Sequence, residues 1–132
     1  MKRVFVDTGA WYALVDRKDP DHGRVVPVFR AYQRRLLSSN FVIDETLTLI
    51  RYRLSWDAAH AFGEKVRAGG LVEVIRVDPA CEDAAWAIFS RYRDKTFSFT
   101  DCTSFALMDR LRPEAALAID QDFRAYGLRC LP

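Results

Sequence analysis

The hydrophobic and polar positions along this chain follow two periods, one typical of strands and the other of helices. Short runs rich in β-branched and aromatic residues predict strands over 2–6, 36–37, 71–77, 115–119 and 128–131. Apolar residues recurring every three or four positions predict helices from position 8, from the turn at 19–21 to about 36, and over 41–54, 56–68, 79–93 and 101–111. Strands that alternate with helices predict a mostly parallel sheet covered by helices on both faces.

Residues that start or stop helices set several of these boundaries. Ser55 and Thr100 are expected to cap the helices that follow them, because a hydroxyl can accept a hydrogen bond from the first helical turn. Gly69 and Pro113 are expected to end helices. Pro27 is expected to mark the start of a helix or a kink in it, because its ring is strained in a helix interior.

Two of the predicted strands lead into aspartates, in VFVDTGAW and LAIDQDF. Asp7 follows the first strand and Asp120 follows the fourth. Ligands of open α/β sheets bind beyond the carboxyl ends of the strands, so both acids fall at the expected binding edge. An aspartate at such a place is also a common turn or cap residue, and that structural explanation stays open.

Two further acids fall on the apolar faces of predicted helices. Glu45 has Phe41 and Leu49 one turn before and after it, whereas the adjacent Asp44 has polar neighbours at those positions. Asp101 begins a helix whose next turns place Phe105 on the same face. An acid in the first turn also complements the helix dipole, which is an alternative explanation of Asp101.

Taken together, these four acids predict a cluster of carboxylates without a basic partner close in sequence. Two like charges about 4 Å apart repel by about 4 kcal/mol at an effective dielectric constant near 20, and a divalent cation removes that cost. Oxygen ligands without histidine or cysteine favour Mg²⁺ or Mn²⁺ over zinc. Such a site suits phosphate chemistry, in which the metal polarises a phosphoryl oxygen.

Composition and charge limit the possible classes of protein and are compatible with this site. The 132 residues are expected to form one domain, 1–132, and the apolar runs are too short for a membrane-spanning helix. Three cysteines without paired spacing predict a cytoplasmic protein without disulfides. The net charge of +2 gives no general attraction to nucleic acid, so RNA contacts would have to come from local clusters, namely Arg34-Arg35, Arg51 with Arg53, and Arg91 with Arg93 and Lys95.

The sequence resembles PIN-domain ribonucleases, specifically the VapC-type toxins of VapBC toxin–antitoxin pairs. The resemblance spans essentially the whole chain. It is carried by VFVDTGAWYAL, SSNFVIDETLTLIR, DKTFSFTDCTSFALMDRL and LAIDQDFRAYGLRCL, in that order and at these separations.

The resemblance implies a three-layer α/β/α fold and an Mg²⁺- or Mn²⁺-dependent endoribonuclease that leaves 5′-phosphate and 3′-hydroxyl ends. It also implies a homodimer and inhibition by a small antitoxin whose tail enters the groove. By match of motif, the acidic quartet is Asp7, Glu45, Asp101 and Asp120, with Asp7 and Asp101 as the expected direct metal ligands. Thr8 matches the hydroxyl residue after the first acid, and Asp122 matches a position that varies within the family.

Other classes of function remain as alternatives. A PIN fold could be a catalytically inactive module that binds RNA or protein. A dehalogenase-type Mg²⁺-dependent phosphatase needs a second aspartate two residues after the first, where this chain has Gly9, and a receiver domain needs an acidic pair at its first strand.

Some aromatic residues and one cysteine also allow two interpretations. Trp11 could stack a base beside Asp7 or lie in the core, and the helical pattern favours the core. Trp56 and Trp86 are interpreted as packing residues, and Cys102 as a small buried residue.

Overall fold

The computed structural model describes residues 2–132, which form five strands and seven helices. In chain order these are β1 (Val4–Val6), α1 (Thr8–Val15), α2 (His22–Ala31), β2 (Leu36–Ser39), α3 (Asn40–Arg53), α4 (Trp56–Ala68), β3 (Glu73–Ile75), α5 (Pro79–Arg91), α6 (Phe99–Leu111), β4 (Ala115–Leu117), α7 (Asp122–Tyr126) and β5 (Cys130–Leu131). The predicted α/β class is confirmed.

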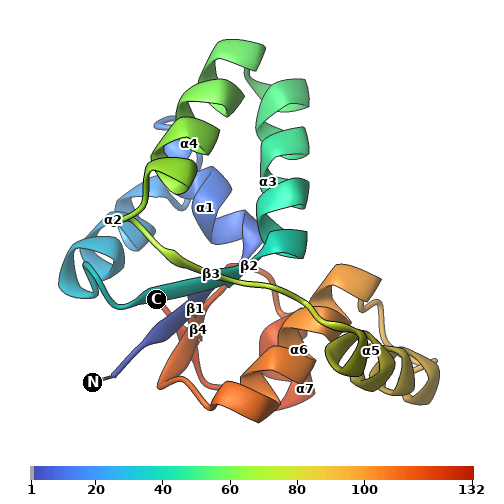
Figure 1. Cartoon of the computed structure of the whole chain (residues 1–132). Helices are drawn as coiled ribbons and strands as arrows, with labels where there is room; N and C mark the ends of the chain where they lie inside the picture. Colours follow the sequence, from blue (N-terminus) through green and yellow to red (C-terminus); the bar gives the residue numbers. More distant parts are fainter. Residues whose placement is uncertain (1) are drawn as a thin grey trace.

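The sheet has the strand order β3-β2-β1-β4-β5, and every neighbouring pair is parallel. Helices α1 to α4 lie on one face of the sheet and α5 to α7 on the other, which gives three layers (Figure 1). The chain moves from β1 outward to β2 and β3, then returns past β1 to β4. The direction of winding therefore changes between β1 and β4, where ligands of such sheets bind.

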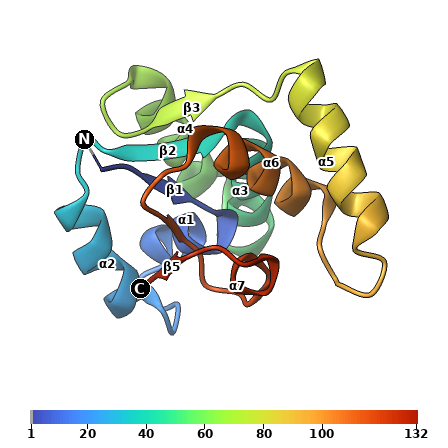
Figure 2. The ribbon, with the colours of Figure 1, turned by 90° about the horizontal axis from the view of Figure 1, so that it is seen from below.

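The central strands β1 and β4 are short, and apolar residues fill them on both faces. All three residues of β1 and all three of β4 are buried, as expected for a parallel sheet between two helical layers. Helix α6 is also buried along most of its length, from Asp101 to Met108, between α5, α3 and α7. Viewed from below, α5 stands out on the side of the molecule opposite α2 (Figure 2).

Several predicted boundaries differ from the structure. Helix α6 is capped by Ser98 and not by Thr100, so it begins at Phe99. Pro27 lies inside α2, which ends at Ala31 instead of near position 36. The predicted strands at 2–6, 71–77, 115–119 and 128–131 are shorter in the structure, and helix α7 was not predicted, because five residues carry too little periodicity to detect.

The structure agrees with the sequence-based interpretation of Trp11 but not with that of Trp56 and Trp86. Trp11 is fully buried and its indole N–H donates a hydrogen bond of 3.3 Å to the Ser38 hydroxyl, so it belongs to the core and offers no face to a base. Interpreting Trp56 and Trp86 as packing residues was wrong, since they are 55% and 61% exposed. A hydrophobic pattern marks an apolar helix face but does not tell whether the same chain covers it.

Cys81, Cys102 and Cys130 are all free thiols, and Cys102 is buried as predicted. None of the helices formed by residues 2–132 is both long enough and apolar enough to cross a membrane.

Candidate active site

Asp7 is the most deeply buried of the predicted acids. It lies directly after β1 and is the N-cap residue of α1, but its side chain accepts no capping hydrogen bond. The residue is 3% exposed, and its Oδ1 atom has no hydrogen-bond partner in the protein. An unpartnered buried carboxylate oxygen is costly, so it points to a ligand or a bound proton.

The charge environment of Asp7 shows which other acids are its neighbours. Burial raises the pKa of the Asp7 carboxyl well above its usual range, and the charge of Asp101 raises it further. The Thr8 backbone N–H lowers this pKa, and the charges of Asp120 and Glu45 raise it in turn. Three acids, from α3, α6 and the segment after β4, therefore act on Asp7 at the end of β1.

Asp101 is held in place by the first turn of α6. Its carboxylate accepts a hydrogen bond of 3.1 Å from the Ser98 backbone N–H, and the Ser98 hydroxyl accepts one of 3.0 Å from the Asp101 N–H. This reciprocal pair is a capping box. Burial is the main cause that raises the Asp101 pKa to about 6, with contributions from the charges of Asp120 and Asp122.

Both explanations of Asp101 offered by the sequence therefore hold: it is an acid in the first turn of a helix, and it is a neighbour of Asp7. Sequence reasoning missed Ser98, although the signal was present: a serine three residues before an acid at the start of an apolar helix is the capping-box pattern.

Asp120 and Asp122 form the outer part of the cluster. Asp120 is exposed as a residue, yet its carboxyl is partly shielded from water, and this desolvation raises its pKa. Its Oδ1 accepts a hydrogen bond of 3.0 Å from the Asp122 backbone N–H. The Asp122 carboxylate in turn accepts one of 3.4 Å from the Thr96 hydroxyl, which connects the loop before α6 to the start of α7.

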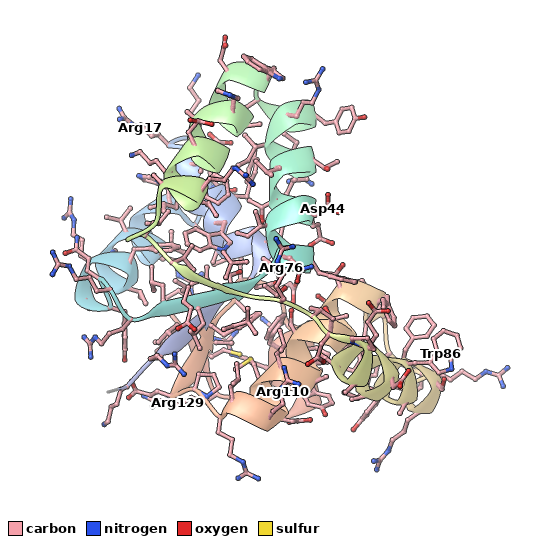
Figure 3. The ribbon with its side chains drawn as sticks, viewed as in Figure 1. Arg17, Asp44, Arg76, Trp86, Arg110 and Arg129 are labelled. Carbon is pink, nitrogen blue, oxygen red and sulfur yellow. The ribbon has the colours of Figure 1, made fainter. Side chains whose placement is uncertain are left out.

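The helical period placed the α3 acids correctly. Glu45 is half-buried and acts on Asp7, whereas Asp44 is exposed and points outward from α3 (Figure 3). Thr8 is buried and its hydroxyl has no hydrogen-bond partner, like that of Ser104 one turn after Asp101 on α6. Sequence reasoning did not single out Ser104.

The chemistry of these donors fits a hard divalent cation. The candidate ligands are carboxylates, one of them has an unpartnered buried oxygen, and among residues 2–132 none of the four acids forms an ion pair with a basic side chain. As the side chains now lie, no three His, Cys, Asp or Glu groups of the described chain are close enough together to hold a metal ion. Binding of a cation would therefore have to draw the carboxylates closer together. Asp120 can move in this way because its side chain is exposed.

Comparison with known proteins gives consistent results. Residues 4–128 match the model of the PIN domain family. The 23S rRNA-specific endonuclease VapC20 of Mycobacterium tuberculosis is 36% identical over 124 residues, covering 94% of both chains. The crystal structure of VapC20, a toxin that cleaves the sarcin–ricin loop, superposes with a TM-score of 0.89 at 34% identity, over 95% of each chain. VapBC2 of Rickettsia felis, solved with a DNA fragment from its promoter, has a TM-score of 0.73 at 8% identity over 96% of each chain, which shows the fold alone.

Proposed function

This chain belongs to the PIN-domain family as a VapC-type member, and from that premise we propose that it is a metal-dependent endoribonuclease, the toxin of a type II toxin–antitoxin pair. The observation that carries the catalytic part is the buried Asp7 carboxylate, with its unpartnered oxygen and a pKa raised by burial and by three other acids. A catalytically inactive binding module has no need for that arrangement, which costs stability.

The ligands we assign to Mg²⁺ or Mn²⁺ are Asp7 and Asp101, with Asp120 completing the set directly or through water. When bound, the ion supplies a Lewis acid that offsets the charge developing on a phosphodiester and lowers the pKa of water. The capping box holds the Asp101 carboxylate in one orientation. Asp7 lies at the dry base of the site, where a charge interacts more strongly than in water.

In this proposal Asp120 has a second part besides completing the ligand set, and Glu45 acts without binding the ion. Asp120 is exposed at the rim, so its carboxylate is available to orient an attacking water and accept its proton. Glu45 is half-buried, and we assign it to keeping the charge of the site negative enough to hold the cation. Asp122 positions Asp120 through its backbone N–H.

RNA is the proposed substrate because the most similar relatives described above act on RNA. Among the clusters predicted to contact RNA, the group formed by Arg91, Arg93 and Lys95 begins at the last residue of α5 and leads toward the start of α6, where Asp101 lies. These side chains are exposed and are the cations placed to contact phosphates beside the acids.

The proposed partners are a second copy of this chain and a small antitoxin with a basic tail. Trp86 and Phe89 are exposed on α5, and their rings contact Phe99 of α6 at centroid distances of 6.5 and 6.1 Å. Figure 3 shows Trp86 pointing away from the body of the molecule. Exposed clustered aromatic rings are typical of protein interfaces, so we assign the homodimer contact to this face.

The test of the catalytic proposal uses the purified chain, a ribosomal RNA stem-loop and Mg²⁺. We expect cleavage at defined positions, and loss of more than about a hundredfold in rate with Asp7→Asn, since even outer-shell partners of metal ligands contribute 10- to 100-fold. Expression in a bacterial host should arrest growth, and the same substitution should relieve the arrest. Equal toxicity and equal RNA levels with both proteins would support the inactive binding module instead.

A further inference from the structure

A row of arginines lies along the edge of the sheet where the strands begin, opposite the acidic site. Arg35, Arg3 and Arg129 immediately precede β2, β1 and β5. Because all strands are parallel, these residues share one edge. Their backbone carbonyls continue the sheet pairing: Val4 N–H donates to Arg35 at 3.0 Å, and Ala116 N–H donates to Arg129 at 2.9 Å. With strands about 4.8 Å apart, the row from β2 to β5 is about 14 Å long.

The surface along this row is hollowed. Two adjoining hollows of about 440 and 430 Å³ share Arg34, Leu36, Gly70 and Leu71 as lining residues. A third, of about 570 Å³, shares Arg3 with the second and extends to Arg112 and Arg129. None of the three is lined by the candidate catalytic acids. We call this strip the basic edge.

The basic edge carries more positive charge than the chain as a whole. The side chains that line its hollows include seven cations and two carboxylates, namely Lys2, Arg3, Arg30, Arg34, Arg35, Arg112 and Arg129 with Glu73 and Glu114. Its net charge is therefore +5 in a chain of net charge +2, which leaves −3 for all other residues. The basic edge is therefore much more positive than the rest of the molecule taken together.

The two carboxylates neutralise only part of this charge. Glu73 pairs with Arg3 at 2.9 Å, and Glu114 pairs with Arg129 at 3.4 Å and Lys2 at 3.8 Å. The Glu114 pKa is lowered, first by a 2.9 Å hydrogen bond from the Tyr32 hydroxyl and then by these cations. Within residues 2–132, no acid lies within 4 Å of the charged groups of Arg30, Arg34 or Arg112.

Two of these unpaired arginines also hold an unusual backbone conformation. Arg34 has φ 66° and Arg112 has φ 49°, and they are the non-glycine residues of the described chain with positive φ. This left-handed conformation is unfavourable for an L-residue with a side chain, and glycine is the usual solution at such a turn. Both positions keep an exposed arginine on the same edge, which is the pattern expected where the side chain has a function.

We propose that the basic edge binds the phosphate backbone of a folded RNA, outside the strand that is cut. This inference rests on the proposed ribonuclease function. The acidic edge repels phosphates, so a large RNA needs cations elsewhere, and strands of three residues separate the two edges by only about 10 Å. None of the exposed large hydrophobic side chains lies on the basic edge, whereas protein interfaces are enriched in such residues. A phosphate backbone is therefore a better fit than a protein surface.

The experiment compares three proteins, each carrying Asp7→Asn to prevent cleavage. The first has no other change, the second has Arg34→Gly with Arg112→Gly, and the control has Arg17→Ala with Lys18→Ala. The control removes the same charge from an exposed loop, and Figure 3 shows Arg17 far from Arg129. Glycine favours the left-handed backbone, so the second protein should melt no lower than the first, and weaker binding would not reflect unfolding.

Affinity for a ribosomal RNA stem-loop is measured between 0.05 and 0.3 M salt. We expect the double glycine variant to bind about tenfold more weakly than the other two proteins near 0.15 M salt. The slope of log affinity against log salt concentration should be shallower by about 1.4 to 1.8, because two lost phosphate contacts release fewer counterions. The same weakening on a DNA duplex of equal length would support recognition of the phosphate backbone.

Unchanged RNA affinity of the double glycine variant would overturn the proposal, as would an equal loss in the control. Unchanged RNA affinity together with weaker binding of poly-glutamate would assign the basic edge to an acidic protein instead. A parallel assay keeps Asp7 and follows cleavage of a short single-stranded RNA, which needs only the acidic edge. If the wild-type chain cuts neither this RNA nor the stem-loop, the ribonuclease proposal fails. If it cuts either one, the binding result decides the basic edge alone.

Discussion

The carboxyl of Asp101, in the first turn of α6, lies close enough to the carboxyl of Asp7, at the end of β1, for its charge to raise the Asp7 pKa. Burial raises the pKa of both groups. At neutral pH and without a cation, the folded chain therefore keeps two acids in a place where ionising them is unfavourable. A site of this kind lowers the stability of the protein in exchange for affinity toward a cation.

Replacing Asp7 by asparagine should therefore stabilise the metal-free protein. The substitution removes a buried negative charge beside three acids and keeps the shape of the side chain. In EDTA at pH 7, we expect Asp7→Asn to melt at a higher temperature than the wild type. With 10 mM Mg²⁺ the wild type should gain stability through binding, by about 2.7 kcal/mol if the concentration is a hundred times the dissociation constant, and the variant should gain little. A lower melting temperature of the variant in EDTA would contradict this account.

The stability of the metal-free protein should also fall as the pH rises. The Asp101 pKa is raised from 3.8 to about 6, so the folded state binds the proton more tightly than the unfolded state. The contribution is fully present below pH 3.8 and is lost as the pH rises through about 6. A shift of roughly two units corresponds to about 3 kcal/mol.

Urea unfolding in EDTA between pH 5 and 8 measures this effect. Asp101→Asn should remove much of the pH dependence, and its side-chain oxygen can still accept the hydrogen bond from the Ser98 N–H. Added Mg²⁺ should flatten the wild-type profile, because the cation competes with the proton. Identical profiles for the wild type and Asp101→Asn in EDTA would count against a raised Asp101 pKa.

Local sequence patterns predicted the elements that position the site. The strand-end rule placed Asp7 and Asp120 at one edge, and the helical period separated Glu45 from the exposed Asp44. The boundary at Ser98 was missed because two hydroxyl residues, at 98 and 100, compete as caps, and only the side-chain geometry distinguishes them.

The basic edge could not be predicted in the same way. It depends on strand order: Arg35, Arg3 and Arg129 are distant in sequence and become neighbours only through the sheet order β2-β1-β4-β5. The exposure of Trp56 and Trp86 depends likewise on the packing of the whole chain, which the periodicity of a single helix does not record.

The capping box of α6 should matter for catalysis beyond its contribution to stability. Ser98→Ala removes the hydroxyl that accepts the Asp101 N–H, which should cost about 1 kcal/mol of unfolding free energy. It should also loosen the Asp101 carboxylate and lower the cleavage rate about tenfold, the low end for residues that orient metal ligands.

Ser55→Ala is a matched control for this prediction. The Ser55 hydroxyl caps α4 with a hydrogen bond of the same length, 3.0 Å, from the Ala58 N–H, and Ser55 is not part of the acidic cluster. We expect a similar loss of stability and an unchanged cleavage rate. Equal rates for the two variants would show that the α6 cap is purely structural.

The products of cleavage should identify which groups carry the reaction. If water attacks the phosphorus with the carboxylates and a cation holding the site, each cut leaves a 5′-phosphate and a 3′-hydroxyl end, and activity is lost in excess EDTA. Attack by the neighbouring ribose hydroxyl would instead leave a 2′,3′-cyclic phosphate and would need no cation. The two outcomes are separated by labelling the ends of the cut RNA: the 5′ end should accept label from polynucleotide kinase only after phosphatase treatment, and the 3′ end should be a direct substrate for poly(A) polymerase. Cyclic phosphate ends, or full activity in EDTA, would remove the metal from this scheme and leave the acidic cluster around Asp7 without a catalytic role.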